Sequence, residues 1–157
     1  MLGQPKAREA SDAGAAVAKA MPAPRLLVID DNALHRLIIC RAAARAGYVP
    51  AQAASCEEAV ELAQATAFDC ITLDLSLGAH TGVEMLRHLQ TIGCKAPIII
   101  VSGSATCRAA LRIARTLKLD VVEWLAKPVD LATLRYSLER IRHRRLLVRG
   151  LATVVAR

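Results

Sequence analysis

The chain alternates between short apolar runs and longer amphipathic segments from residue 26 onward. Leu26 to Ile29 is a continuous apolar run, which is typical of a strand buried on both faces of a parallel sheet. Comparable runs recur along the chain, separated by turn residues. Together they predict five strands, at residues 26–29, 49–53, 69–74, 98–101 and 121–125.

Amphipathic segments between these runs predict helices. Leu34, Leu37 and Ile38 have the spacing of three or four residues that is typical of a helix. Ser55 is a suitable N-cap for the second helix, with Glu58 as its capping-box partner. The predicted helices cover residues 33–46, 55–65, 83–91, 105–117 and, opening at Asp130 or Thr133, a last segment to about residue 148.

Strand and helix alternate five times, which predicts a parallel sheet with helices on both faces and right-handed crossovers. No internal repeat or second domain is visible in the sequence. Sheets of this kind bind ligands at the carboxyl ends of their strands. The residues that follow each strand are therefore the first candidates for a functional site.

Composition fits one globular domain, since the chain has 157 residues and is 54% hydrophobic. Its net charge of +7 permits nucleic acid, an anionic membrane surface or simply solvated arginines. There is no apolar run of the length needed for a transmembrane helix and no secretory signal. We expect a cytoplasmic protein, without membrane insertion, whose residues 1–24 form a flexible N-terminal leader.

The five cysteines are scattered and include no C-x-x-C pair. Their number and spacing predict neither a disulfide framework nor a zinc site. Four of them fall in predicted helices or strands. We therefore expect free, mostly buried thiols in a reducing compartment.

Polar side chains stand at the ends of four predicted strands. Asp30 and Asp31 follow the first strand, Asp74 ends the third, Ser102 follows the fourth and Lys127 follows the fifth. Each alone has an ordinary explanation as a helix cap, a turn residue or a solvated charge. Their common placement at the ligand-binding edge of the sheet favours a shared site.

The residue types of this cluster predict phosphoryl chemistry. Close carboxylates repel one another unless a cation joins them, and hard oxygen ligands suit Mg²⁺. An ion held by Asp31 and Asp74 leaves one oxygen of Asp74 free to attack phosphorus and form an acyl phosphate. Lys127 and the Ser102 hydroxyl would then meet the charge on the transferring group.

At this point the chain resembles the receiver domains of bacterial two-component response regulators, over about residues 25–145. The motifs that carry the resemblance are LLVIDDN (26–32), ITLDLSLGAHTG (71–82), PIIIVSGS (97–104) and LAKP (125–128). The resemblance implies a flavodoxin-like, doubly wound α/β fold: a five-stranded parallel sheet of order 2-1-3-4-5 with five helices. Residues 146–157 would be a basic C-terminal helix extension or tail.

The resemblance also implies a role for each acidic residue. Asp74 would be the phosphorylated aspartate. Asp31 would bind Mg²⁺ directly, Asp30 mainly through water, and the backbone carbonyl of Ser76 would complete the protein ligands.

Other positions follow the family pattern or depart from it. Ser102 resembles the switch hydroxyl, and Lys127 the lysine that contacts the phosphoryl group, with a Lys-Pro peptide that is commonly cis. Gly82 matches the family's glycine in the loop after the third strand. Gly78 stands where proline is usual, and Trp124 where tyrosine or phenylalanine is usual, so its role is either switching or simple packing. The stretch from residue 102 to 127 is a few residues longer than is usual in the family.

We therefore expect a stand-alone receiver that accepts a phosphoryl group on Asp74 from a histidine kinase or a histidine phosphotransfer protein. The reaction would depend on Mg²⁺, and the output would be a changed affinity for a downstream protein target. We expect no enzyme activity beyond self-catalysed phosphorylation and hydrolysis. The sequence leaves the oligomeric state open, a homodimer included.

A second hypothesis starts from the basic C-terminal segment, which carries five arginines: Arg140, Arg142, Arg144, Arg145 and Arg149. The alternative is a phosphorylation-independent, receiver-like scaffold that binds a partner or nucleic acid there. Nucleic acid is the less favoured partner, because no helix-turn-helix fits after residue 145. A dehalogenase-type phosphatase is disfavoured because Ser76 stands where that family has a second acid. His35 and His80 lie near the predicted site without an assigned role.

Overall fold

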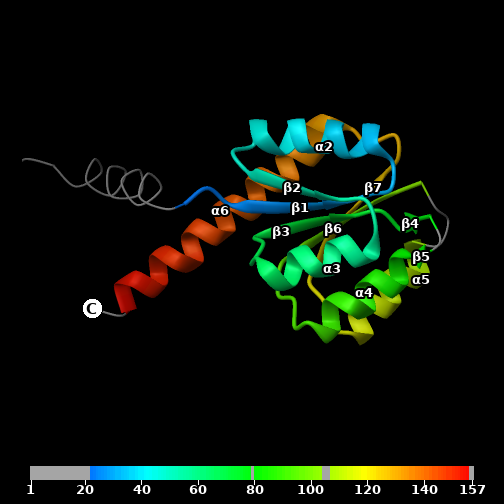
Figure 1. The fold of residues 1–157 in the computed structure, drawn as a ribbon. Helices are drawn as coiled ribbons and strands as arrows, with labels where there is room; N and C mark the ends of the chain where they lie inside the picture. The colour runs from blue at the N-terminus through cyan, green and yellow to red at the C-terminus, as the bar shows by residue number, and fades with distance from the viewer. Residues whose placement is uncertain (1–21, 79, 104–106, 156–157) are drawn as a thin grey trace, which may run out of the picture.

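The computed structural model describes residues 22–78, 80–103 and 107–155. Residues 1–21 of the expected leader and the predicted helix start at residue 105 lie outside these ranges. Five parallel strands form one sheet: β1 (Arg25–Ile29), β2 (Val49–Ala53), β3 (Cys70–Leu73), β6 (Ile98–Ser102) and β7 (Val121–Ala126). Their order is β2-β1-β3-β6-β7, which confirms the doubly wound arrangement implied by the resemblance (Figure 1).

Each predicted helix is present. The helices are α2 (Ala33–Arg45), α3 (Cys56–Ala65), α4 (Gly82–Thr91), α5 (Cys107–Thr116) and α6 (Leu131–Val155). The last one runs beyond the predicted end near residue 148 and passes the edge of the sheet (Figure 1). Within the described ranges, no helix combines the length and apolar character that a membrane span requires.

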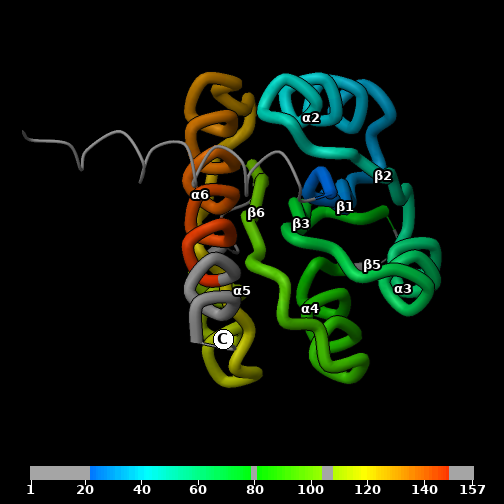
Figure 2. The backbone as a smooth tube through the Cα atoms, turned by 90° about the vertical axis from the view of Figure 1, so that its left-hand side faces the viewer, coloured from blue at the N-terminus to red at the C-terminus, as the bar shows by residue number. Residues whose placement is uncertain are grey.

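The helices cover both faces of the sheet, with α2 and α6 on one side and α3, α4 and α5 on the other (Figures 1 and 2). In β1, Leu27 and Ile29 belong to the core beneath α3 and α4. Leu26 and Val28 belong to the core beneath α2 and α6. All four are buried, which explains why this strand is an unbroken apolar run.

The face that α2 buries differs from the one its large apolar residues mark. Leu34 is 61% exposed and Leu37 is 43% exposed. The buried residues of α2 are Ile39, Cys40, Ala42 and Ala43. The sequence spacing predicts the helix correctly, but mostly small residues form its contact with the sheet.

Arginines of the basic C-terminal segment hold α6 against the body of the domain. The contacts are Arg140 Nη2 to Glu123 Oε2 at 3.3 Å, Arg142 Nη1 to Ala46 O at 3.2 Å, and Arg145 Nε to Asp69 Oδ1 at 2.7 Å. The last is an ion pair without hydrogen-bond geometry. Arg144 is exposed. A fully solvated basic face is therefore not what the structure shows, because three of these side chains have partners within the chain.

Four of the cysteines are free thiols in the structure, as predicted. Cys40, Cys56 and Cys70 are buried, and Cys94 is half-buried. Burial raises the pKa of the Cys70 thiol to about 12. This thiol is therefore protonated and unreactive at neutral pH.

Candidate functional site

The two central strands bring Asp30 and Asp74 together. β1 and β3 pair in parallel with Ile29 opposite Leu73, so the residue after each strand lies at the same edge. The Asp74 N–H donates to the Ile29 carbonyl at 2.9 Å. Asp30 is 1% exposed and Asp74 is 4% exposed. The acid at the end of an apolar strand is therefore a buried carboxylate rather than a solvated turn residue.

The loop between β1 and α2 is braced by its own polar groups. Asn32 is the N-cap of α2, and its side chain accepts N–H groups of the first turn. The Asn32 N–H donates to Asp30 Oδ1 at 2.9 Å. Arg36 Nη1 donates to the carbonyls of Asp30 at 2.7 Å and Asp31 at 3.1 Å. These bonds leave the Asp31 side chain exposed at the same edge.

The loop after Asp74 contains a short hairpin that the sequence did not predict. It consists of β4 (Ser76–Leu77) and β5 (His80–Thr81), which pair antiparallel. The Ser76 N–H donates to Asp74 Oδ1 at 3.0 Å. This bond orients the carboxylate and places Ser76 beside it.

Gly82 allows the backbone to return close to this loop. Its N–H donates to the Leu75 carbonyl at 2.9 Å. A Cβ on Gly82 would lie 2.5 Å from Leu75 Cα and 3.0 Å from the Asp74 carbonyl oxygen. Only glycine fits here without moving backbone, so the match to the family's glycine has a packing reason.

Gly78 also has a structural reason. Its φ is +58°, a conformation that proline, with φ fixed near −65°, cannot adopt. A Cβ at this position would lie 3.7 Å from Asp31 Oδ2. The backbone conformation at this position therefore excludes the usual proline, and the loop passes close to Asp31.

Lys127 completes the cluster and comes from the loop after β7, which is the outermost strand on one side of the sheet. It follows β7, and the Lys127–Pro128 peptide is cis. Its ammonium contacts Asp30 Oδ2 at 2.7 Å, Asp74 Oδ2 at 2.5 Å and His35 Nδ1 at 3.0 Å. Burial alone would lower the pKa of Lys127, but its hydrogen bonds to Asp30 and Asp74 and their negative charges outweigh this and raise the pKa overall.

The structure predicts that Lys127→Met lowers the free energy of unfolding in metal-free buffer by about 3 kcal/mol, because Asp30 and Asp74 lose their counter-ion. Urea unfolding of both proteins measures the difference.

Since the folded-state pKa of Lys127 lies above its ordinary value of 10.5, the contribution of its charge to stability is complete below that pH. It is lost as the pH rises through the folded-state pKa. A difference that stays constant into this alkaline range would contradict the assignment.

The three aspartates can supply oxygen ligands to one cation. Asp30, Asp31 and Asp74 each offer a carboxylate oxygen, and these atoms lie within 4.8 Å of one another. Three hard, anionic oxygens are the donor set that Mg²⁺ or Ca²⁺ prefers. The residues present therefore fit a divalent cation at this edge.

Ser102 and Trp124 lie on the two strands next to the cluster. Ser102 is fully buried at the end of β6, and its carbonyl accepts the Lys127 N–H at 3.3 Å.

The pairing of β7 with β6 is irregular at Val122, which is an extra residue in β7. Val121 lies opposite Ile98, whereas Glu123 lies opposite Ile99. Trp124 is 46% exposed, so core packing does not account for the whole ring; its role as a switch stays a prediction.

His35 also belongs to the site, although no role was predicted for it from the sequence. The residue lies in the first turn of α2, and its Nδ1 is 3.0 Å from Lys127 Nζ and 3.5 Å from Asp30 Oδ2. Its place soon after the acidic pair was the only sequence signal.

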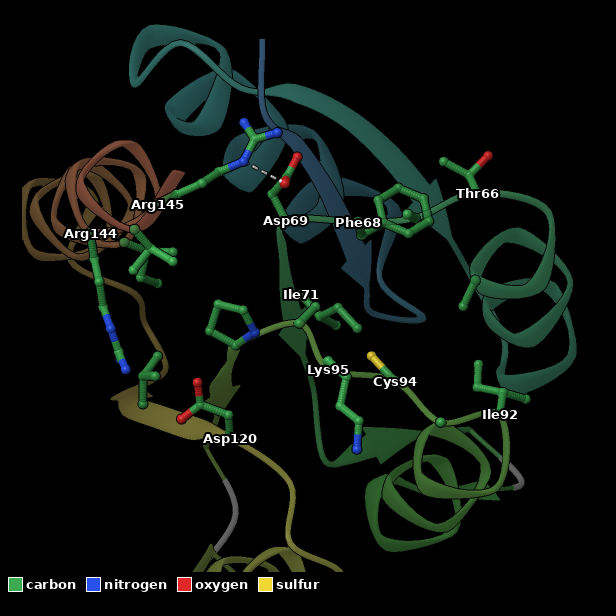
Figure 3. A pocket seen from close by; sticks show the side chains of 18 residues that line it. Thr66, Phe68, Asp69, Ile71, Ile92, Cys94, Lys95, Asp120, Arg144 and Arg145 are labelled. Atoms are coloured by element: carbon green, nitrogen blue, oxygen red, sulfur yellow. Dashed lines mark ion pairs between the residues drawn. The ribbon is translucent and has the colours of Figure 1, made fainter. Parts of the chain in front are cut away.

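A separate groove of about 600 Å³ lies at the opposite edge of the sheet. Its lining combines apolar side chains such as Phe68 and Ile92 with Lys95, Asp120 and Arg144. Figure 3 shows Arg144 on the α6 side of the groove, with Asp120 drawn between it and Lys95, and the ion pair of Arg145 with Asp69. The aspartate cluster is therefore distinct from this groove.

Comparisons with known proteins agree with this geometry. The model of the response regulator receiver domain family matches residues 26–139. The transcriptional regulatory protein ZraR of Klebsiella oxytoca is 28% identical over 122 residues, which cover 77% of this chain and 27% of ZraR. The chain thus spans about a quarter of the length of this curated relative.

Solved structures show the same fold. The chemotaxis response regulator CheY4 of Vibrio cholerae superposes with a TM-score of 0.65 at 25% identity, covering 76% of this chain and 99% of that one. A response regulator protein from Burkholderia pseudomallei has a TM-score of 0.62 at 30% identity, covering 79% and 74%. That structure contains a phosphorylated aspartic acid, a calcium ion and citrate. The strand order, the aspartate cluster and these matches show that the chain belongs to the response regulator receiver domain family of two-component systems.

Proposed function

We propose that this chain accepts a phosphoryl group on Asp74 from a histidine kinase or a histidine phosphotransfer protein. The observation that carries the proposal is the convergence of Asp30, Asp31, Asp74 and Lys127 at one sheet edge. Asp74 is the member whose carboxylate contacts both the Lys127 ammonium and the Ser76 N–H. It is therefore held and oriented on both of its oxygens.

In the transfer, a carboxylate oxygen of Asp74 forms a bond to phosphorus while the bond between phosphorus and the donor breaks. The leaving group is the imidazole nitrogen of the partner histidine, or the acetate oxygen when acetyl phosphate is the donor, and it keeps the electron pair. The Lys127 ammonium then lies beside the added negative charge, where a fixed cation stabilises the transition state most. Ser102, at the end of the neighbouring strand, would contribute its hydroxyl to the same group.

Asp30, Asp31 and Asp74, together with the Ser76 carbonyl, would hold Mg²⁺. When bound, such an ion would supply positive charge to the phosphoryl oxygens. The Burkholderia pseudomallei relative, whose structure contains both a phosphorylated aspartic acid and a calcium ion, supports this assignment. The proposal covers signalling through a downstream protein, in the cytoplasm, without any other enzyme activity.

The test is incubation of the purified chain with acetyl phosphate, with Mg²⁺ or with excess EDTA. Intact-mass spectrometry should detect one added phosphate with Mg²⁺ and none with EDTA. Peptide mapping should locate the phosphate on Asp74. The absence of any adduct from acetyl phosphate, phosphoramidate or a phosphorylated phosphotransfer protein would overturn the proposal.

A second candidate function is docking of an acidic protein segment in the groove beside α6. The groove supports it because its lining combines apolar side chains with Lys95 and Arg144, and neither cation has an ion pair among the described residues. Ile141, Arg144, Arg145 and Val148 of the lining lie beyond the family match, which ends at residue 139. The acidic partner is favoured because exposed cations on a chain of net charge +7 attract negative charge.

Genetic replacement separates the two candidates. If docking is essential, the gene that carries Arg144→Glu should fail to rescue the phenotype of a deletion strain. Arg135→Glu is the control for charge, because it makes the same charge change on an exposed part of α6 outside the groove; it also removes the exposed ion pair of Arg135 with Glu139. Loss of rescue with Asp74→Asn, and full rescue with Arg144→Glu, would contradict the docking function and favour phosphorylation.

A further inference from the structure

The ammonium of Lys127 has no N–H left for another acceptor. A lysine ammonium carries three N–H donors. Its three contacts are Asp30 Oδ2 at 2.7 Å, Asp74 Oδ2 at 2.5 Å and His35 Nδ1 at 3.0 Å. A phosphoryl oxygen on Asp74 must therefore displace one of these acceptors before it can bind the ammonium.

His35 is the acceptor that is easiest to displace. An ammonium has no lone pair, so His35 Nδ1 accepts the bond, and the ring proton of the neutral imidazole is assigned to Nε2. The bonds to Asp30 and Asp74 join opposite charges and are stronger than a bond to a neutral ring. The His35 side chain is also 42% exposed, whereas that of Asp30 is 1% exposed.

Hydrogen bonds fix the helical turn that carries this imidazole. The His35 N–H donates to the Asn32 side chain at 3.1 Å, which fixes the first turn of α2. The next residue, Arg36, ties the same turn to the Asp30 carbonyl at 2.7 Å. The ring therefore reaches Lys127 from a rigid helix end rather than from a mobile loop.

We propose that His35 is a positioning residue that holds Lys127 in the unphosphorylated protein and releases it when the phosphoryl group arrives. This inference rests on the proposed phosphorylation of Asp74. The hydrogen bond between Lys127 and His35 is present in the resting state and absent from the transition state. Because this bond must break during the reaction, His35 raises the activation barrier and slows phosphoryl acceptance. Once the phosphoryl oxygen has replaced the imidazole, His35 has no further effect on hydrolysis.

The closing experiment compares His35→Ala with His35→Asn, whose amide oxygen offers an acceptor close to the position of Nδ1. With acetyl phosphate and Mg²⁺, His35→Ala should be phosphorylated about three- to tenfold faster, the effect of one lost hydrogen bond. His35→Asn should remain near the wild-type rate. The rate of phosphoryl loss should be equal in all three proteins. His88→Ala, which removes an exposed imidazole on α4, is the matched control and should change neither rate.

A measurement without phosphorylation tests the contact itself. In ¹H–¹⁵N spectra of the unphosphorylated protein, the Lys127 ammonium protons should exchange with water several-fold faster in His35→Ala than in wild type or His35→Asn. Unchanged exchange would overturn the inference, and so would slower phosphorylation of His35→Ala. If the wild-type protein accepts no phosphate, the proposed function fails, and the exchange measurement still decides whether His35 holds Lys127.

Discussion

Asp74→Asn is expected to abolish phosphorylation, the largest functional effect of any single change in this chain. Asparagine keeps an oxygen that can accept the Ser76 N–H, which now lies 3.0 Å from Asp74 Oδ1. Its neutral amide lacks the carboxylate needed to attack phosphorus. The fold should therefore survive while the chemistry is lost. Intact mass after incubation with acetyl phosphate and Mg²⁺ measures the result.

Asp120→Asn is the matched control, since Asp120 is an exposed carboxylate at the opposite edge of the sheet, in the groove. It should be phosphorylated at the wild-type rate. Thermal unfolding of both variants checks that neither is misfolded. A phosphate adduct on folded Asp74→Asn would contradict the assignment, and peptide mapping would then show which other residue accepts it.

Gly82→Ala is expected to cause a large loss of stability through the addition of a single methyl group. The added Cβ would lie 2.5 Å from Leu75 Cα and 2.7 Å from Leu75 Cδ2, closer than real atoms approach. Relief requires the backbone beside Asp74 to move, because Leu75 is buried. We expect a decrease of about 3 kcal/mol in the free energy of unfolding, measured by urea denaturation.

Gly103→Ala provides the comparison at the same edge of the sheet. Its added Cβ would lie 3.7 Å from Lys127 Cβ, an ordinary van der Waals contact. This variant should stay within about 0.5 kcal/mol of wild type. Equal stability of the two alanine variants would show that the loop after Asp74 adjusts without cost, and the packing reason for Gly82 would be wrong.

The sequence predicted the strands and the central cluster because both depend on simple periodic rules. Apolar runs buried on both faces predict β1 and β6, and the parallel arrangement predicts that Asp30 and Asp74 lie at one edge of the sheet. Lys127 followed from the same rule. The cluster was predictable because each member stands directly at a strand end.

Other features depend on contacts that periodicity does not encode. The hairpin β4–β5 has strands of two residues, too short for any alternation to appear. The contact of His35 with Lys127 joins residues 92 positions apart, and it depends on how the first turn of α2 is oriented. Leu34 and Leu37 are large and apolar but exposed, because small residues allow α2 to lie close to the sheet.

The long final helix gives the domain a mechanical property. Among the described side chains, the last one that fastens α6 to the sheet is Arg145, through Asp69. The ten residues that follow Arg145, up to Val155, extend the helix by about 15 Å at 1.5 Å per residue. Because this segment extends beyond that ion pair, a small tilt of α6 at Arg145 would displace Val155 farther than the residues that pack on the sheet.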